Sequence, residues 1–172
     1  MDIITHAIWL VQRLNDPQFA SEAAATSEQL HDIQRSPQGW QVADALLQSE
    51  DQSRQFYGAL TFQIKLNRDA QNLPPADAKA VLERLLEKFA KVVNDAQAAH
   101  VLVLDKLCSA LATYIVQLPE SWNNALGEVA TYLVNGATTV NQGNDGRDHA
   151  NVISRLQAHQ VNAMLRLSLI HI

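Results

Sequence analysis

Apolar residues recur at the three- and four-residue spacing of an α-helix along almost the whole chain. Such spacing gathers apolar side chains on one face of a helix, which can then pack against a neighbour. The sequence shows no sustained alternation of apolar and polar residues, the pattern of a strand. We therefore expect an all-α fold, with helices over residues 3–14, 17–34, 37–49, 52–69, 76–95, 99–118, 120–134 and 149–167.

Prolines lie between these segments or at their first residue, and not in their interior. Pro17 follows Asp16, and Pro37 follows Ser36. Each pair has the order of an N-cap residue followed by proline at the first helical position. Pro119 also precedes a new apolar pattern. These prolines are therefore predicted to mark the starts of helices.

The helices are predicted to form pairs that repeat along the chain. The first helix of each pair begins near residue 2, 37, 76 or 120. A spacing of roughly 35–45 residues is typical of HEAT and armadillo repeats. One pair cannot bury its apolar face alone, so neighbouring pairs must stack. We therefore expect an α-solenoid of about four HEAT-type antiparallel helix pairs.

Composition limits the classes of function that the chain can have. Of its 172 residues, 47% are hydrophobic and 18% are charged, and its net charge of −5 argues against a nucleic-acid-binding surface over the whole chain. Cys108 is the single cysteine, so no disulfide can form within the chain, which favours a reducing compartment. No apolar run reaches the roughly 18 residues of a membrane span. We expect no direct contact with nucleic acid or membrane.

Motifs for catalysis, cofactors or metals are not found in the sequence. The histidines form no HExxH motif and have no cysteine at metal-ligand spacing. Cys108 belongs to an apolar helical stripe, which predicts a buried, inert thiol. Residues 141–152 resemble a calcium loop, but Val152 stands where a bidentate Glu is required. The sequence therefore predicts no catalytic, cofactor-binding or metal-binding residues.

Two blocks of residues resemble one known family. The first, residues 31–74, contains Gln34, Ser36, Trp40, Leu46–Leu47, Phe56–Tyr57–Gly58–Ala59, Lys65 and Leu73–Pro74. The second, residues 104–129, contains Leu107–Cys108, Ala110–Leu111–Ala112, Leu118–Pro119 and Trp122. In these residues the chain resembles the N-terminal part of the importin-β (karyopherin) family of nuclear transport receptors, and in particular the transportin-SR and importin-thirteen group.

The resemblance covers about residues 3–134, which would be importin-β-like N-terminal HEAT repeats. Residues 135–148, rich in Gly and Asn, match no part of the family pattern and are predicted to be a flexible loop. Residues 149–172 are expected to form the last helix and a tail that results from truncation of a longer receptor.

The resemblance implies a function in nuclear transport and no enzymatic activity. N-terminal repeats of this family bind the GTP-bound form of the small GTPase Ran. Cargo proteins and the Phe-Gly nucleoporins are partners of the full-length receptor, which shuttles between nucleus and cytoplasm. Because GTP orders the switch loops of a GTPase, a rigid complementary surface can distinguish the GTP form from the GDP form.

The second helix of each pair is expected to line the face that binds Ran. Polar residues fall on one side of two of these helices, and the lysine at position 65 also matches the family pattern. The predicted contacts are Arg54, Thr61, Lys65 and Arg68 on residues 52–69, and Lys106, Ser109 and Thr113 on residues 99–118.

Two other functions remain open from the sequence. A generic HEAT or armadillo scaffold would bind an unrelated protein and would not bind Ran. A small all-helical enzyme would need a closed pocket with converging titratable groups, and the sequence offers no candidate cluster.

Overall fold

The computed structural model describes residues 1–95, 100–121, 125–135 and 156–169. The helices are α1 (Ile3–Leu14), α2 (Ala23–Arg35), α3 (Gly39–Gln48), α4 (Gln52–Asp69), α5 (Pro75–Asn94), α6 (Val101–Gln117), α7 (Ala125–Asn135) and α9 (Ala158–Leu169). Short 3-10 helices lie at η1 (Pro17–Glu22), η2 (Ala70–Asn72) and η3 (Pro119–Ser121). The described residues contain no strand. The predicted all-α class is confirmed.

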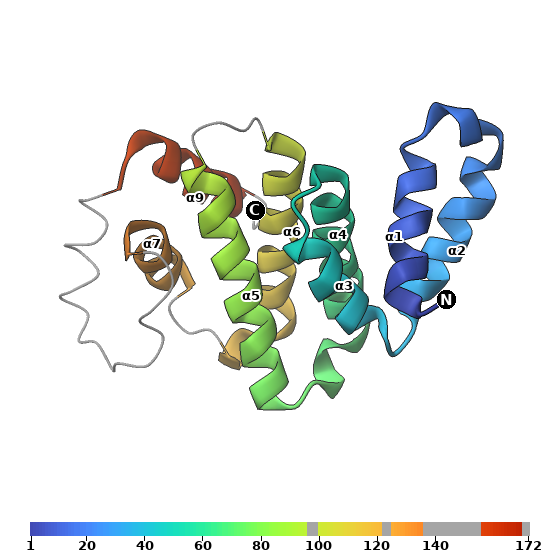
Figure 1. Cartoon of the computed structure of the whole chain (residues 1–172). Coiled ribbons are helices and arrows are strands. Elements are labelled where there is room, and N and C mark those ends of the chain that lie inside the picture. The colour runs from blue at the N-terminus through green and yellow to red at the C-terminus, as the bar shows by residue number, and fades with distance from the viewer. Residues whose placement is uncertain (96–99, 122–124, 136–155, 170–172) are drawn as a thin grey trace.

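The helices form two layers along one row (Figure 1). In the first layer α1 contacts α3, α3 contacts α5, and α5 contacts α7. In the second layer α2 contacts α4, α4 contacts α6, and α6 contacts α9. Each helix therefore packs against its own partner and against the neighbouring pair, as in a solenoid. The predicted helical solenoid is confirmed. The predicted loop 135–148 lies almost wholly outside the described residues.

Capping explains where several helices begin. The Asp2 carboxylate accepts hydrogen bonds from the backbone N–H groups of Ile4 and Thr5, both at 3.0 Å. Asp16 accepts from Gln18 N–H at 2.9 Å, and Asp51 accepts from Arg54 N–H at 2.9 Å. These side chains satisfy N–H groups that have no partner within the helix. The predicted cap at Asp16 is confirmed, although it opens the 3-10 helix η1 and not a continuous α-helix.

The predicted cap at Ser36 is wrong. The Ser36 hydroxyl donates backwards to the Ile33 carbonyl at 2.7 Å, so it closes the end of α2. Pro37 lies in the turn that follows, and α3 begins only at Gly39. A polar residue before a proline fits either the end of one helix or the start of the next. The chain uses Ser36 for the end.

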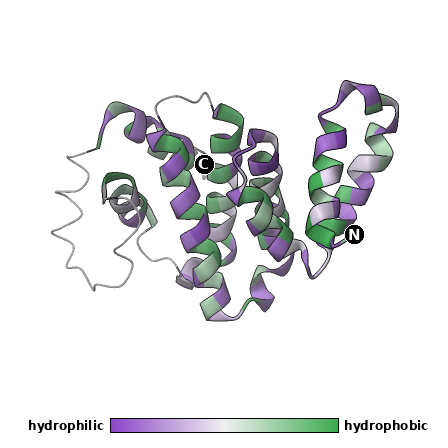
Figure 2. Cartoon of the chain, viewed as in Figure 1, coloured by the Kyte–Doolittle hydropathy of each residue, from purple (hydrophilic) through white to green (hydrophobic). Residues whose placement is uncertain are grey.

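Buried apolar residues form two clusters. The smaller cluster joins α1, α2 and α3, and the larger joins α3 to α9. Helix α3 belongs to both, because Val42 and Leu46 face the first pair while Ala43 and Leu47 face the later helices. Figure 2 shows green and purple bands on different faces of the helices, as this burial requires. Helix α3 therefore joins the two clusters through its buried residues.

Gly58 allows α4 to lie against the backbone of α3. A Cβ atom at Gly58 would be 2.5 Å from the backbone nitrogen of Leu47 and 2.8 Å from its Cα. Real Cβ contacts are essentially never this short. Gly58 therefore has a close-packing role, and it sets the separation of the two helices. No helix in the described ranges is long and apolar enough to span a membrane.

Candidate partner-binding face

Lys65, a predicted partner contact, is buried in the structure. Its side chain is 2% exposed, and its ammonium donates to the Ser36 carbonyl at 3.0 Å and pairs with the Asp69 carboxylate one turn along α4. The ammonium also lies 5.4 Å from the ring centroid of Trp40. Lys65 thus connects α4 to the turn between the first two helix pairs.

Other residues of the first block gather at the same turn. The Gln34 side-chain amide donates to the Thr61 hydroxyl at 3.0 Å, and that hydroxyl donates to the Tyr57 carbonyl at 2.6 Å. At Gly39 a Cβ would lie 2.4 Å from the Gln34 carbonyl oxygen, so the turn admits no larger residue without rearrangement. We call the set Gln34, Ser36, Gly39, Trp40, Thr61 and Lys65 the inter-pair clamp. Its visible role is to fix one helix pair on the next.

The predicted contacts therefore separate into two groups. Thr61, Lys65 and Thr113 are buried, and the expectation that they lie on an open face is corrected. The physical reason is that α4 contacts α2, α3 and α6, and α6 contacts α4, α5 and α9, so that neighbours cover more than one side of each helix. The residues that remain at least partly exposed are Arg54, Arg68, Lys106 and Ser109.

The open side of α4 is the one that carries Ser53, Phe56, Leu60 and Asn67. These residues follow the three- and four-residue spacing of one helical face and are partly or fully exposed. Its neighbour α6 exposes Leu102, Lys106, Ser109 and Val116 at the same spacing. The Lys106 ammonium lies 5.8 Å from the Phe56 ring centroid, which shows that the two open sides adjoin. We call these eight residues the α4–α6 face.

The α4–α6 face is more apolar than sequence reasoning predicted. Leu102 is 71% exposed and Val116 is 66% exposed. Neither residue belongs to the row of apolar side chains by which α6 packs into the core. Their position outside that row is the sequence feature that could have predicted an exposed apolar surface. Exposed apolar residues beside a charged one are typical of protein-binding surfaces. A groove of about 300 Å³ lies at the end of the face where Ser53, Phe56 and Leu102 meet.

Hydroxyl groups on the α6 part of the face are already bonded. Ser109 donates to the Asp105 carbonyl, and Thr113 donates to the Ser109 carbonyl, each at 2.8 Å. Ser109 can therefore accept a hydrogen bond from a partner but is not free to donate one, whereas Thr113 is buried. Beside them, the Asp105 carboxylate pairs with Arg166, which ties α9 to α6. Lys106 is left as the predicted contact on α6 that offers a charge.

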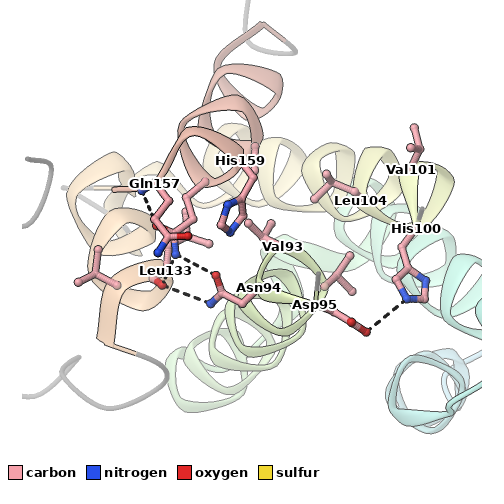
Figure 3. A pocket seen from close by; sticks show the side chains of 13 residues that line it. Val93, Asn94, Asp95, His100, Val101, Leu104, Leu133, Gln157 and His159 are labelled. Carbon is pink, nitrogen blue, oxygen red and sulfur yellow. Dashed lines mark hydrogen bonds and ion pairs between the residues drawn. The ribbon is translucent and has the colours of Figure 1, made fainter. Parts of the chain in front are cut away.

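A second groove, of about 760 Å³, lies between the ends of α5 and α7 and the starts of α6 and α9 (Figure 3). The Gln160 amide donates to Asn94 and to the Leu133 carbonyl, both at 2.8 Å. His100 Nε2 lies 3.7 Å from an Asp95 carboxylate oxygen. Asn94 and Gln160 are thus occupied in joining helices. Among the lining residues that the structure describes there is a His–Asp pair but no Ser, Thr or Cys that could serve as a nucleophile.

Cys108 does not provide a nucleophile elsewhere. Its side chain is fully buried, and burial, followed by the charge of Asp105, raises the pKa of the thiol to about 12. A thiol with this pKa is protonated at neutral pH and therefore unreactive. The residues that the structure describes also contain no group of three or more His, Cys, Asp or Glu side chains that could hold a metal ion.

Part of the chain is similar to a nuclear transport protein. A segment of 87 residues is 41% identical to the importin beta-like protein kap111 of Schizosaccharomyces pombe. The segment represents 50% of this chain and 9% of the yeast protein, so the chain corresponds to a small part of that relative. No family model matches the chain, and no solved structure matches it. The similarity supports an importin-β-like origin for half of the chain.

Proposed function

We propose that this chain is part of a nuclear transport receptor of the importin-β family, and that its helix pairs bind the GTP-bound form of Ran. The observation that carries the proposal is the 41% identity to an importin beta-like protein over half of the chain. The solenoid of stacked helix pairs is consistent with it. Within the family we assign the chain to the transportin-SR and importin-thirteen group, on the motif residues of its first two helix pairs.

The α4–α6 face is the surface that we assign to Ran. Lys106 lies at its centre, next to Phe56, and Arg68 is exposed at the end of α4. These cations can meet acidic groups, while Leu102 and Val116 supply apolar area. Arg54 and Ser109 lie within reach as secondary contacts. Thr61 and Lys65 are buried in the packing of α4, and Thr113 is buried between Ser109 and Val116 on α6, so none of the three is assigned a direct contact with the partner.

Discrimination between GTP and GDP would come from shape. The γ-phosphate and its magnesium order the switch loops of a GTPase, and these loops relax after hydrolysis. A face built on packed helices stays rigid, so it fits the ordered loops better than the relaxed ones. In a longer receptor, binding of Ran and of cargo would be linked reciprocally by about 1–3 kcal/mol. Such a receptor would also bind Phe-Gly nucleoporins and shuttle between nucleus and cytoplasm.

The test is capture of purified Ran by the purified 172-residue chain, with Ran loaded either with a non-hydrolysable GTP analogue or with GDP. We expect selective capture of the GTP form. Lys106→Glu and Leu102→Asp should each weaken it by roughly tenfold or more, because they place a like charge or an unpaired charge in the interface. Lys79→Ala, an exposed change on the first-helix layer, is the matched control and should have no effect.

Other outcomes distinguish the alternatives. If the GTP form is captured selectively and neither substitution weakens the capture, the proposed receptor function stands. The Ran-binding site would then lie outside the α4–α6 face. Equal capture of the two nucleotide forms, or no capture by a chain shown to be folded by circular dichroism, would contradict the proposal. The second of these results would favour a helical scaffold with an unrelated partner.

A further inference from the structure

Lys88 on α5 is buried although its surroundings in the sequence are charged. The spacing of Glu83, Arg84, Glu87 and Lys91 predicts a solvated helix surface around it. In the structure Lys88 is only 8% exposed, whereas its neighbour Lys91 is 64% exposed. Lys88 therefore differs from the other charged residues of this helix.

A groove lies over Lys88. It has a volume of about 270 Å³ and is formed by α3 and α5 on the first-helix layer, away from the α4–α6 face. Its lining residues are Asp44, Leu47, Gln48, Arg84, Glu87, Lys88 and Lys91. Ligand pockets range from about 300 to 1,000 Å³. The groove therefore has room for one or two side chains.

The other cations of the groove have partners. Arg84 lies 3.5 Å from the Asp44 carboxylate and 3.9 Å from that of Glu87, and Lys91 lies 3.5 Å from that of Glu50. Lys88, in contrast, has no hydrogen bond or ion pair with any residue that the structure describes. Lys88 is therefore the unpaired cation among the lining residues that the structure describes.

The position of Lys88 is unfavourable for its charge. Burial, together with the charge of Lys91, lowers the pKa of the Lys88 ammonium, and the charges of Glu50 and Glu87 oppose this only in part. Lys88 Nζ is not among the fully buried polar atoms that lack a partner, so the ammonium opens into the groove, where its charge has lost part of its hydration and has no counter-ion in contact. A carboxylate placed in the groove would supply the missing partner.

We propose that this groove binds an acidic segment of a partner protein, with one Asp or Glu carboxylate of that segment paired with the Lys88 ammonium. Leu47 provides apolar contact, and Gln48 and Asp44 can accept hydrogen bonds from the peptide backbone. A nucleic-acid strand would need a continuous basic surface for its successive phosphates, and the carboxylates of Asp44, Glu50 and Glu87 interrupt such a surface, whereas one peptide carboxylate needs only the Lys88 ammonium. The inference does not depend on binding of Ran.

The test uses two capped tripeptides, acetyl-Glu-Leu-Glu-amide and its counterpart acetyl-Gln-Leu-Gln-amide, at millimolar concentrations. Binding to the full chain is followed by backbone amide NMR. We expect the Glu peptide to shift resonances of α3 and α5 around the groove, and the Gln peptide to leave them unchanged. Lys88→Met should weaken binding by roughly tenfold or more, because it removes a charge-assisted contact.

Controls keep the result interpretable. Lys79→Met removes a cation from the same helix but outside the groove, so it should retain binding. Lys88→Met should fold at least as well as the parent chain, since it replaces an unpaired buried charge with an apolar side chain of similar length. Lys88→Gln serves as a second variant if the first does not fold.

Several outcomes would overturn the inference. These are no shifts with the Glu peptide, equal shifts with the Gln peptide, shifts that persist in the folded Lys88 variants, or shifts located away from α3 and α5. If a short oligothymidylate binds more tightly than the Glu peptide, the groove is a phosphate-binding site, and the proposal of an acidic protein segment is wrong.

Discussion

At the scale of single residues, the burial of Lys65 shows that a residue of a family motif need not contact a binding partner. Lys65 belongs to the motif that resembles transport receptors, and it was therefore a natural candidate for a partner contact. The structure uses its ammonium to satisfy the Ser36 carbonyl and to pair with Asp69. A residue can thus be part of a family motif because it fixes the stacking of repeats. Lys106, which is not one of the matched motif residues, is the better candidate for contact.

Replacement of Lys65 by Met tests this structural role. The Ser36 carbonyl would lose its lysine donor and Asp69 would lose its cation, so we expect Lys65→Met to lower the free energy of unfolding by about 1–3 kcal/mol. Urea denaturation followed by circular dichroism measures the change. Arg68→Met, an exposed change three residues along α4, should stay within about 0.5 kcal/mol of the parent chain. Equal free energies of unfolding for the two variants would contradict a stabilising role of Lys65 in the inter-pair clamp.

At the scale of the element, α4 is packed on several sides. Its residues Ala59, Phe62 and Leu66 lie in the larger core cluster, and Tyr57 packs on the smaller cluster. Gly58 brings its backbone against that of α3. The helix therefore connects both clusters and leaves open only the side with Ser53 and Asn67. Amphipathic periodicity, which assumes one buried and one solvated face, describes such a helix poorly.

Gly58→Ala should show that close packing outweighs helix propensity. Alanine is favoured over glycine by about 1 kcal/mol in an exposed helix interior. At Gly58 the new methyl group would collide with the Leu47 backbone, and the strain of such overpacking is about 1–3 kcal/mol. We expect a net loss of stability in thermal unfolding, with Ser53→Ala on the open side of α4 as the control. A rise in the melting temperature of Gly58→Ala would show that the helices can separate without cost.

At the scale of the whole molecule, each helix pair is stabilised mainly by its contacts with the neighbouring pairs. The first pair is joined to the rest mainly through α3, whose Val42 and Leu46 complete the smaller cluster. In a solenoid each repeat contacts only its neighbours, so local damage need not spread along the chain. The α4–α6 face belongs to the second and third pairs. It lies between the first pair and the pair of α7 and α9, so neighbours on both sides hold it (Figure 1).

A cavity in the first pair should therefore have a local effect. Leu10 is fully buried in the smaller cluster, and truncation of a buried leucine to alanine costs about 2–5 kcal/mol. We expect Leu10→Ala to increase amide hydrogen exchange in α1 and α2 while α5 and α6 stay protected. Leu85→Ala, in the larger cluster, is the matched comparison and should expose α5 and α6 instead. Uniform loss of protection in both variants would show a single cooperative unit.

The amino-acid sequence by itself determined the helical class, the pairing of helices and most of their limits, because apolar spacing and capping are local properties. Asp16 and Asp51 act on N–H groups two or three residues away, so their neighbours suffice to explain them. It did not determine which polar residues are buried. Lys65 reaches the distant Ser36 carbonyl, and Lys88 is covered where α3 meets α5. Those contacts depend on how one helix pair stacks on the next, and only the tertiary structure decides that.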